Sequence, residues 1–171
     1  GLLMQSEITY LHCGEPLRSY LKNEIDEILQ VVELIKWEEV FQVTTEKVTL
    51  FNQRAYNKIF QIEFEKLGWE SQSKLSGNPN LIGGFQKNFV LVEVQFGRDS
   101  ATLYRDFYKF QDGQSNGPTS LKVLIVPSNP KKFFPTRPNW ADKMADYDLA
   151  VRYFSVLPIS VPTMIIGLVP N

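Results

Sequence analysis

The amino-acid sequence predicts a single α/β domain in which helices cover a central mixed β-sheet. The chain has 171 residues, the size of one ordinary domain. No internal repeat and no linker-like stretch divides it. Segments with helical spacing alternate with short apolar runs, an order typical of α/β proteins. We therefore expect one domain over residues 1–171; Gly1–Leu3, which precede Met4, look like residues added by cloning.

Two segments in the first half show the spacing of amphipathic helices. From Leu17 to Ile35, apolar residues recur every three or four positions, behind Pro16, which suits the first turn of a helix. A second pattern runs from about Asn52 to Leu67 and ends at Gly68, a residue type that commonly caps helices. We expect a helix over each range.

Three apolar runs predict strands of the sheet. The first is Phe89–Phe96, whose period-two alternation places valine and phenylalanine side chains on one face, and Glu93 and Gln95 on the other. The second and third are Leu121–Val126 and Thr163–Val169, in which most residues are apolar. Such runs are typical of strands buried on both faces.

The segments between these elements complete the predicted order. Ser71–Lys87 and Pro127–Pro138 are rich in polar residues, glycine and proline, and we expect loops there. A helix is predicted after Gly97, reaching to Phe110, and another over Trp140–Phe154.

The composition indicates a folded protein without a strong overall charge. Hydrophobic residues make up 43%, and 18 basic residues face 19 acidic ones. The net charge therefore gives no indication of a nucleic-acid partner, although positive charge can still be concentrated in one cleft. Cys13 and His12 are the only residues of their types, which excludes an intrachain disulfide and a zinc site built on several histidines. We expect a cytoplasmic protein without a membrane span.

Glu93 and Gln95 are the first candidates for chemistry. They share one face of a strand whose other face is apolar, so they present two oxygen-bearing groups to one place. Such a pair can hold a hard metal ion. A half-exposed strand that carries two polar residues by chance explains the pattern equally well. Spacing alone leaves both interpretations open.

The run Leu91–Phe96 resembles the active-site strand of the type II restriction endonucleases typified by BglII and BstYI. In that group Glu-x-Gln replaces the commoner Glu-x-Lys of PD-(D/E)xK nucleases. Three further stretches agree in order and spacing: Glu65–Trp69, the segment after Gly97 and Arg98, and Val161–Leu168. The resemblance covers nearly the whole chain and implies a restriction endonuclease-like fold.

The resemblance also implies an activity. It implies a homodimeric enzyme of a restriction-modification system, which hydrolyses double-stranded DNA at a short palindrome with a GATC core, using Mg²⁺ and no nucleotide cofactor. Two-fold protein symmetry matches palindromic DNA. The Glu93 carboxylate and the backbone carbonyl of Val94 are implied metal ligands, and Gln95 would orient the attacking water. Glutamine itself cannot act as a base at neutral pH.

One position departs from the family. Its members carry an aspartate, the main metal anchor, at the position that is Gly84 here. Loss of that carboxylate predicts weak metal binding and strongly reduced cleavage. Three explanations stay open: a deliberately inactivated variant, a naturally degenerate homologue, or recruitment of another carboxylate such as Glu70. The rivals to an active nuclease are a non-catalytic DNA-binding homologue and an unrelated α/β protein with a chance Glu-x-Gln strand.

The candidate DNA contacts fall into two groups. The resemblance points to Arg98, and to the stretch Asn139–Asp142 with Asn139, Trp140 and Asp142, as base-reading residues in the major groove. An arginine can bind guanine in a bidentate manner, whereas an exposed arginine at a strand end is the simpler alternative. Lys131, Lys132 and Arg137 form a basic cluster in a proline-rich segment, suited to phosphate contacts or to plain solvation.

Overall fold

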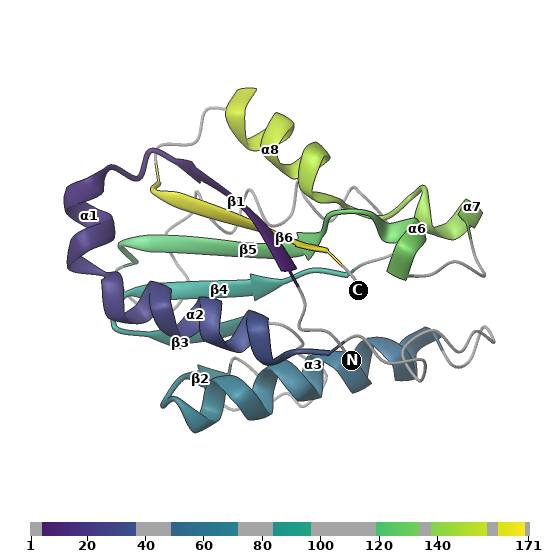
Figure 1. Cartoon of the computed structure of the whole chain (residues 1–171), viewed down its shortest axis with the longest axis horizontal. Coiled ribbons are helices and arrows are strands. Elements are labelled where there is room, and N and C mark those ends of the chain that lie inside the picture. The colour runs from purple at the N-terminus through teal and green to yellow at the C-terminus, as the bar shows by residue number, and fades with distance from the viewer. Residues whose placement is uncertain are drawn as a thin grey trace.

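The fold is a mixed six-stranded β-sheet with helices on both faces (Figure 1). The structure is a computed structural model, and it describes residues 5–36, 49–71, 84–96, 119–133, 138–156 and 161–169. The strands are β1 (Gln5–Leu11), β2 (Glu70–Ser71), β3 (Gly84–Lys87), β4 (Val90–Val94), β5 (Leu121–Pro127) and β6 (Thr163–Val169). The helices are α1 (Glu15–Tyr20), α2 (Lys22–Leu34), α3 (Thr49–Lys66), α6 (Pro130–Phe133), α7 (Pro138–Ala141) and α8 (Tyr147–Val156).

The strand order is β1-β6-β5-β4-β3-β2. The three central strands β4, β5 and β6 are parallel, and β1, β3 and β2 join them in antiparallel pairs. All residues of β4 and β5 are buried, because helices cover the centre of the sheet on both sides. The predicted α/β class and the mixed sheet are thus confirmed.

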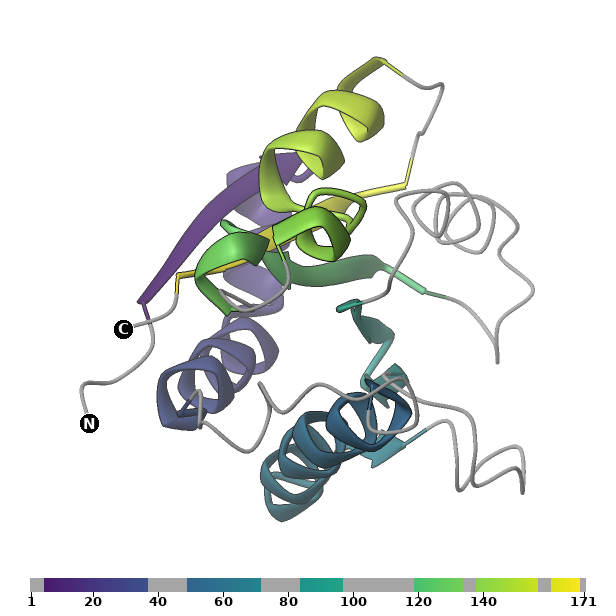
Figure 2. The same ribbon diagram turned by 90° about the vertical axis from the view of Figure 1, so that its right-hand side faces the viewer.

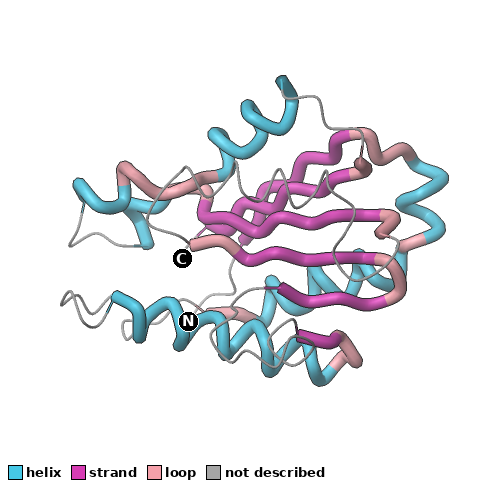
Figure 3. The backbone as a smooth tube through the Cα atoms, turned by 180° about the vertical axis from the view of Figure 1, so that it is seen from behind, coloured by secondary structure: helices cyan, strands magenta, loops and turns pink. Residues whose placement is uncertain are grey.

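Two hydrophobic clusters lie on opposite faces of the sheet. The larger one joins α2 and α3 to alternate residues of the strands, including Val92, Val123 and Met164. The smaller one joins α8 to the residues between them, such as Leu124 and Ile165. Figure 2 shows α8 on one side of the sheet and the pair α2 and α3 on the other. The backbone tube of Figure 3 shows the same layers from behind.

Several predicted elements are confirmed, with adjusted ends. The helix predicted over residues 52–67 is α3, which starts three residues earlier. The runs 121–126 and 163–169 are β5 and β6. Gly68 follows α3 with φ of 86°, a conformation that favours glycine and ends the helix. The helix predicted after Gly97 lies outside the described residues.

The helix predicted over residues 17–35 is wrong as one element. It is two helices, α1 and α2, which meet at Leu21 with φ of -99° and ψ of 19°. Leu21 is buried and continues the apolar spacing, so the pattern conceals the break. The helix predicted over residues 140–154 is likewise divided, into the end of α7 and the later helix α8.

The predicted loop over residues 71–87 was wrong at both ends. Ser71 closes β2, and Gly84–Lys87 form β3, which pairs with β4 in a hairpin. The hairpin turns at Asn88 and Phe89, with φ of 47° and 68°. Positive φ at both turn residues matches the twist of a two-residue hairpin. Phe89, predicted to begin the strand, is therefore an exposed turn residue.

Two other differences concern the N-terminal strand and the proline-rich segment. The edge strand β1 was not predicted, because its residues are mostly exposed and polar. Residues 127–138, predicted as a loop, hold the last residue of β5, the short helix α6 and the first residue of α7. Within the described residues, no helix is long and apolar enough to cross a membrane.

Candidate active site

Glu93 and Gln95 are both buried, although both side chains are polar. Glu93 is 5% exposed near the C-terminal end of β4, and Gln95 is 8% exposed just beyond the end of that strand. The backbone N–H of Gln95 donates to the carbonyl of Ile125 at 2.8 Å, so the ladder between β4 and β5 continues past Glu93. The half-exposed strand considered above is therefore ruled out, because neither side chain faces open solvent.

The hydrophobic core orients these two side chains. Val90, Val92 and Val94 of β4, together with Phe96, belong to the larger cluster under α2 and α3. Since side chains alternate along a strand, Glu93 projects to the opposite face. The apolar face predicted from the sequence is thus confirmed, and it fixes the direction of the polar one.

Gly84 lies directly beside Glu93. It is the first residue of β3 and pairs with Glu93 in the antiparallel register. Directly opposed residues place their side chains on one face of the sheet, with Cβ atoms about 5 Å apart. An aspartate at this position would therefore stand next to the Glu93 carboxylate. The register matches the place where the family resemblance puts its metal-anchoring aspartate.

The oxygen donors of the site are of the type that magnesium prefers, but the site has only one carboxylate, the smallest number common in magnesium sites. Glu93 offers a carboxylate and Val94 a backbone carbonyl, both of them hard oxygen donors. Magnesium is commonly held by one or two carboxylates together with substrate phosphates. The described part of the chain contains no group of three or more His, Cys, Asp or Glu residues that could hold a metal ion. These donors fit an ion that arrives with a phosphate better than a tightly held resident one.

Glu70, the carboxylate considered as a replacement, lies at some distance from Glu93. It lies in β2, two strands away from β4, and pairs with Gln86 of β3. Strand spacing and rise place its Cα about 12 Å from that of Glu93. The Glu70 side chain is exposed, whereas Glu93 is buried.

Sequence reasoning missed a third buried polar residue on this face, Lys122 of β5. It is 1% exposed, and its neighbours in register are Leu91 of β4 and Thr163 of β6. A lysine inside a run of Leu, Val and Ile was the available signal, because an isolated lysine is almost never fully buried without a compensating group.

The structure places four of the candidate DNA contacts on the surface. Lys131 and Lys132 are exposed in α6, Asn139 is exposed in α7, and Asp142 is exposed just after it. The Nζ of Lys131 lies 3.0 Å from Oδ1 of Asp142. An ion pair this exposed contributes little to stability, so both groups can change partners.

The two short helices lie near the site end of the sheet. Figure 1 shows α6 and α7 beyond the ends toward which the parallel strands β4, β5 and β6 point. Glu93 and Gln95 also lie at that end of β4. Arg98 and Arg137 fall outside the described residues, and of Trp140 only the backbone in α7 is described.

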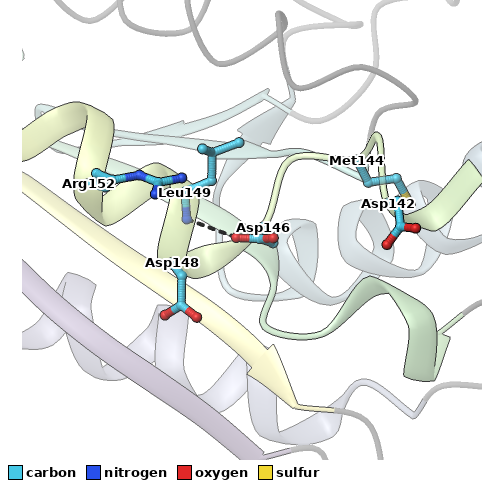
Figure 4. Close-up of a pocket in the computed structure, with 6 residues that line it drawn as sticks. All are labelled: Asp142, Met144, Asp146, Asp148, Leu149 and Arg152. Atoms are coloured by element: carbon cyan, nitrogen blue, oxygen red, sulfur yellow. Dashed lines mark hydrogen bonds between the residues drawn. The ribbon is translucent and has the colours of Figure 1, made fainter.

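A cavity of about 490 Å³ lies beside α8 and is separate from the residues of β4. Its lining includes Asp142, Asp146, Asp148 and Arg152 (Figure 4). Asp146 acts as a helix cap, since its Oδ1 accepts a hydrogen bond from the N–H of Leu149 at 2.8 Å.

The fold and this site define a class of protein. The structure is similar to the crystal structure of restriction endonuclease BglII complexed with a DNA 16-mer, with a TM-score of 0.64 and 19% sequence identity. The match covers 98% of this chain and 78% of that one. The chain therefore has the fold of a restriction endonuclease.

The family follows from the sequence. The model of the family described as restriction endonuclease BglII/BglIII matches residues 6–168, and the chain belongs to this family. Comparison with curated proteins finds no match. The resemblance stated from Leu91–Phe96 and the three other stretches is thereby confirmed.

Proposed function

We propose that the chain is a type II site-specific deoxyribonuclease that hydrolyses double-stranded DNA at a short palindrome with a GATC core. It acts in the cytoplasm as a homodimer with Mg²⁺, as one half of a restriction-modification system. The observation that carries the proposal is the buried Glu93 and Gln95 at the end of a central strand, in a chain of this family. A two-fold dimer presents one such site to each strand of a palindrome.

Each residue of the site has a proposed role. The carboxylate of Glu93 and the carbonyl of Val94 would hold the metal together with a phosphate oxygen of the DNA and water molecules. Bound magnesium supplies an activated water and neutralises phosphate charge. The amide of Gln95 orients that water by hydrogen bonding and takes no proton from it. Because both side chains are buried against the sheet, their positions vary little.

The surface residues are proposed to hold the DNA. Lys131 and Lys132 suit phosphate contacts, since lysine and arginine side chains supply most of the sequence-independent affinity for a duplex. Asn139 and Asp142 suit the edges of bases, with Trp140 between them. Arg98 and Arg137 complete the proposed DNA-binding set. The shared fold with a protein solved in complex with DNA supports DNA binding as such.

A second candidate function is sequence-specific DNA binding without cleavage. The pairing of Gly84 with Glu93 favours it, because the position that would complete the metal site has no side chain. A single carboxylate binds magnesium weakly, and the folded DNA-binding surface does not depend on it.

Digestion of unmethylated plasmid DNA separates the two functions. The unchanged protein and Gly84→Asp are incubated with DNA in magnesium and in EDTA. We expect slow magnesium-dependent cleavage by the unchanged protein. Gly84→Asp should cleave much faster and at lower magnesium concentration, because the added carboxylate stands beside Glu93. If a folded Gly84→Asp protein binds DNA and yields no discrete fragments, the nuclease assignment is wrong and the binding function remains.

Glu93→Ala provides the matching loss of function. We expect it to abolish cleavage in the Gly84→Asp background while DNA binding persists, because phosphate contacts elsewhere supply most of the affinity. Gel-shift titration and digestion are run on the same samples. Unchanged cleavage by the Glu93→Ala variant would show that the catalytic site lies elsewhere.

A further inference from the structure

Lys122 is a buried lysine on the face of the sheet that carries Glu93. In β5, Leu121, Val123 and Ile125 belong to the cluster under α2 and α3, and Leu124 belongs to the cluster under α8. The alternation therefore places Lys122 on the side of Leu124. Glu93 pairs with Leu124, so its side chain projects to the same side.

The burial of Lys122 requires a compensating group. The residue is 1% exposed, and moving an ammonium group out of water is costly unless an anion or several acceptors surround it. Its register neighbour Leu91 is apolar, and the hydroxyl of Thr163 already donates to the carbonyl of Val161 at 2.9 Å. These two neighbours do not supply a charge.

Glu93 is the nearest carboxylate in register on this face among the described residues. It lies on the adjacent strand and two positions along, which places the two Cα atoms about 8 Å apart. Glutamate and lysine side chains span this separation readily. The other carboxylates that the described strands carry on this face are those of Glu70 and Glu7, which are exposed and lie two strands away from β4 and from β5, respectively.

We propose that Lys122 is a positioning residue of the site, whose buried ammonium group offsets the charge of the Glu93 carboxylate across the β4–β5 ladder. The consequence concerns DNA binding and rests on the function proposed above. A pair of net charge zero does not repel a phosphate, whereas an uncompensated carboxylate does. The protein therefore binds its DNA site without a metal ion.

The first test is a double-mutant cycle on thermal unfolding, and it needs no DNA. Lys122→Met and Glu93→Gln each leave a buried group without its counter-charge, so each lowers the melting temperature, by roughly 10 °C for the loss of lysine. The double variant Lys122→Met/Glu93→Gln melts higher than Lys122→Met alone, because the stranded carboxylate is gone. This recovery is the result that a merely space-filling lysine would not give.

Lys87 supplies the matched control. It is a lysine of β3 on the opposite face, and its Nζ lies 2.6 Å from a carboxylate oxygen of Glu27. Lys87→Met is destabilising too, but its effect adds to that of Glu93→Gln without recovery. If the Lys122 double variant melts no higher than Lys122→Met, or if neither folds, the proposal is overturned.

The second measurement is DNA affinity by fluorescence anisotropy, with duplexes that carry a GATC core, in EDTA and in Ca²⁺. The unchanged protein binds the duplex with about the same affinity in EDTA and in Ca²⁺. Lys122→Met binds about tenfold more weakly in EDTA and recovers in Ca²⁺, and the double variant recovers in EDTA. Coupling in the melting cycle with no DNA binding by any protein would refute the proposed function alone. DNA binding with an additive cycle would refute the role of Lys122 alone.

Discussion

The two faces of the central sheet differ in what they bury. Toward α2 and α3 the strands present apolar side chains, and the aromatic rings of Phe64 and Phe85 stack with centroids 4.6 Å apart. Toward α8 the same strands bury Glu93, Lys122 and Thr163 among apolar neighbours. Each site residue is thus held by core residues on either side of it in the sequence.

This difference teaches how one strand serves both stability and chemistry. Apolar burial is non-directional and stabilises in proportion to area, so the α2 and α3 face can hold the strands rigidly. Buried polar groups require specific partners and contribute little net stability. Damage to the first face should therefore lower stability without changing the site, whereas damage to the second should change the site itself, in addition to any loss of stability.

The largest expected effect comes from Phe64→Ala. Phe64 is fully buried between Phe85 and Trp69, and its truncation should lower the free energy of unfolding by about 3–5 kcal/mol. Urea denaturation measures this change, with Ile62→Ala on the exposed side of the same helix as the control. DNA affinity per folded molecule should not change. A loss of affinity without a loss of stability would contradict the division between the faces.

Gly167→Ala tests the face that carries the site. A Cβ at Gly167 would collide with the Oγ of Ser128 and approach the Cγ of Tyr147 to 2.6 Å. Overpacking of this kind should cost about 1–3 kcal/mol. Gly14→Ala is the control, because its nearest contact would be Pro16 Cδ at an ordinary 3.7 Å. Equal melting temperatures for Gly167→Ala and the unchanged protein would show that α8 moves away at no cost.

Cys13 gives the smallest effect and sharpens the comparison, since it belongs to the α2 and α3 cluster. Burial raises the pKa of its thiol, and the nearby Arg18 only partly opposes this. A raised pKa means less thiolate at a given pH, so at pH 8 iodoacetamide should react several-fold more slowly with Cys13 than with glutathione. The rate should increase in Phe64→Ala and stay unchanged in Gly167→Ala. Fast alkylation of the unchanged protein would indicate that this face opens readily.

The centre of the fold could be predicted from the sequence, and its edges could not. The strands β5 and β6 are mostly apolar, because both of their faces are buried. The edge strand β1 is mostly exposed, so it lacks an apolar run. The hairpin between β3 and β4 was hidden, because its turn uses Phe89 at positive φ, a conformation that aromatic residues seldom adopt.

The candidate site was predicted in part. The period of a strand is enough to place Glu93 and Gln95 on one face, but it does not determine whether that face is buried. The pairing of Gly84 with Glu93 depends on where the hairpin turns, and a shift of one residue would move Gly84 to the other face. Lys122 was passed over because its strand was interpreted by its apolar majority.

The pairing of β1 with β6 links residues 5–11 to residues 163–169. During synthesis, β1 emerges from the ribosome long before β6, its partner among the described strands, exists. Contacts between segments so distant in sequence form slowly, since closing a long loop costs entropy before the strands gain anything. Until then β1, and the edge of β5 that later pairs with β6, are unpaired edges that other chains can join. Nascent chains should therefore need protection from aggregation until β6 has been made.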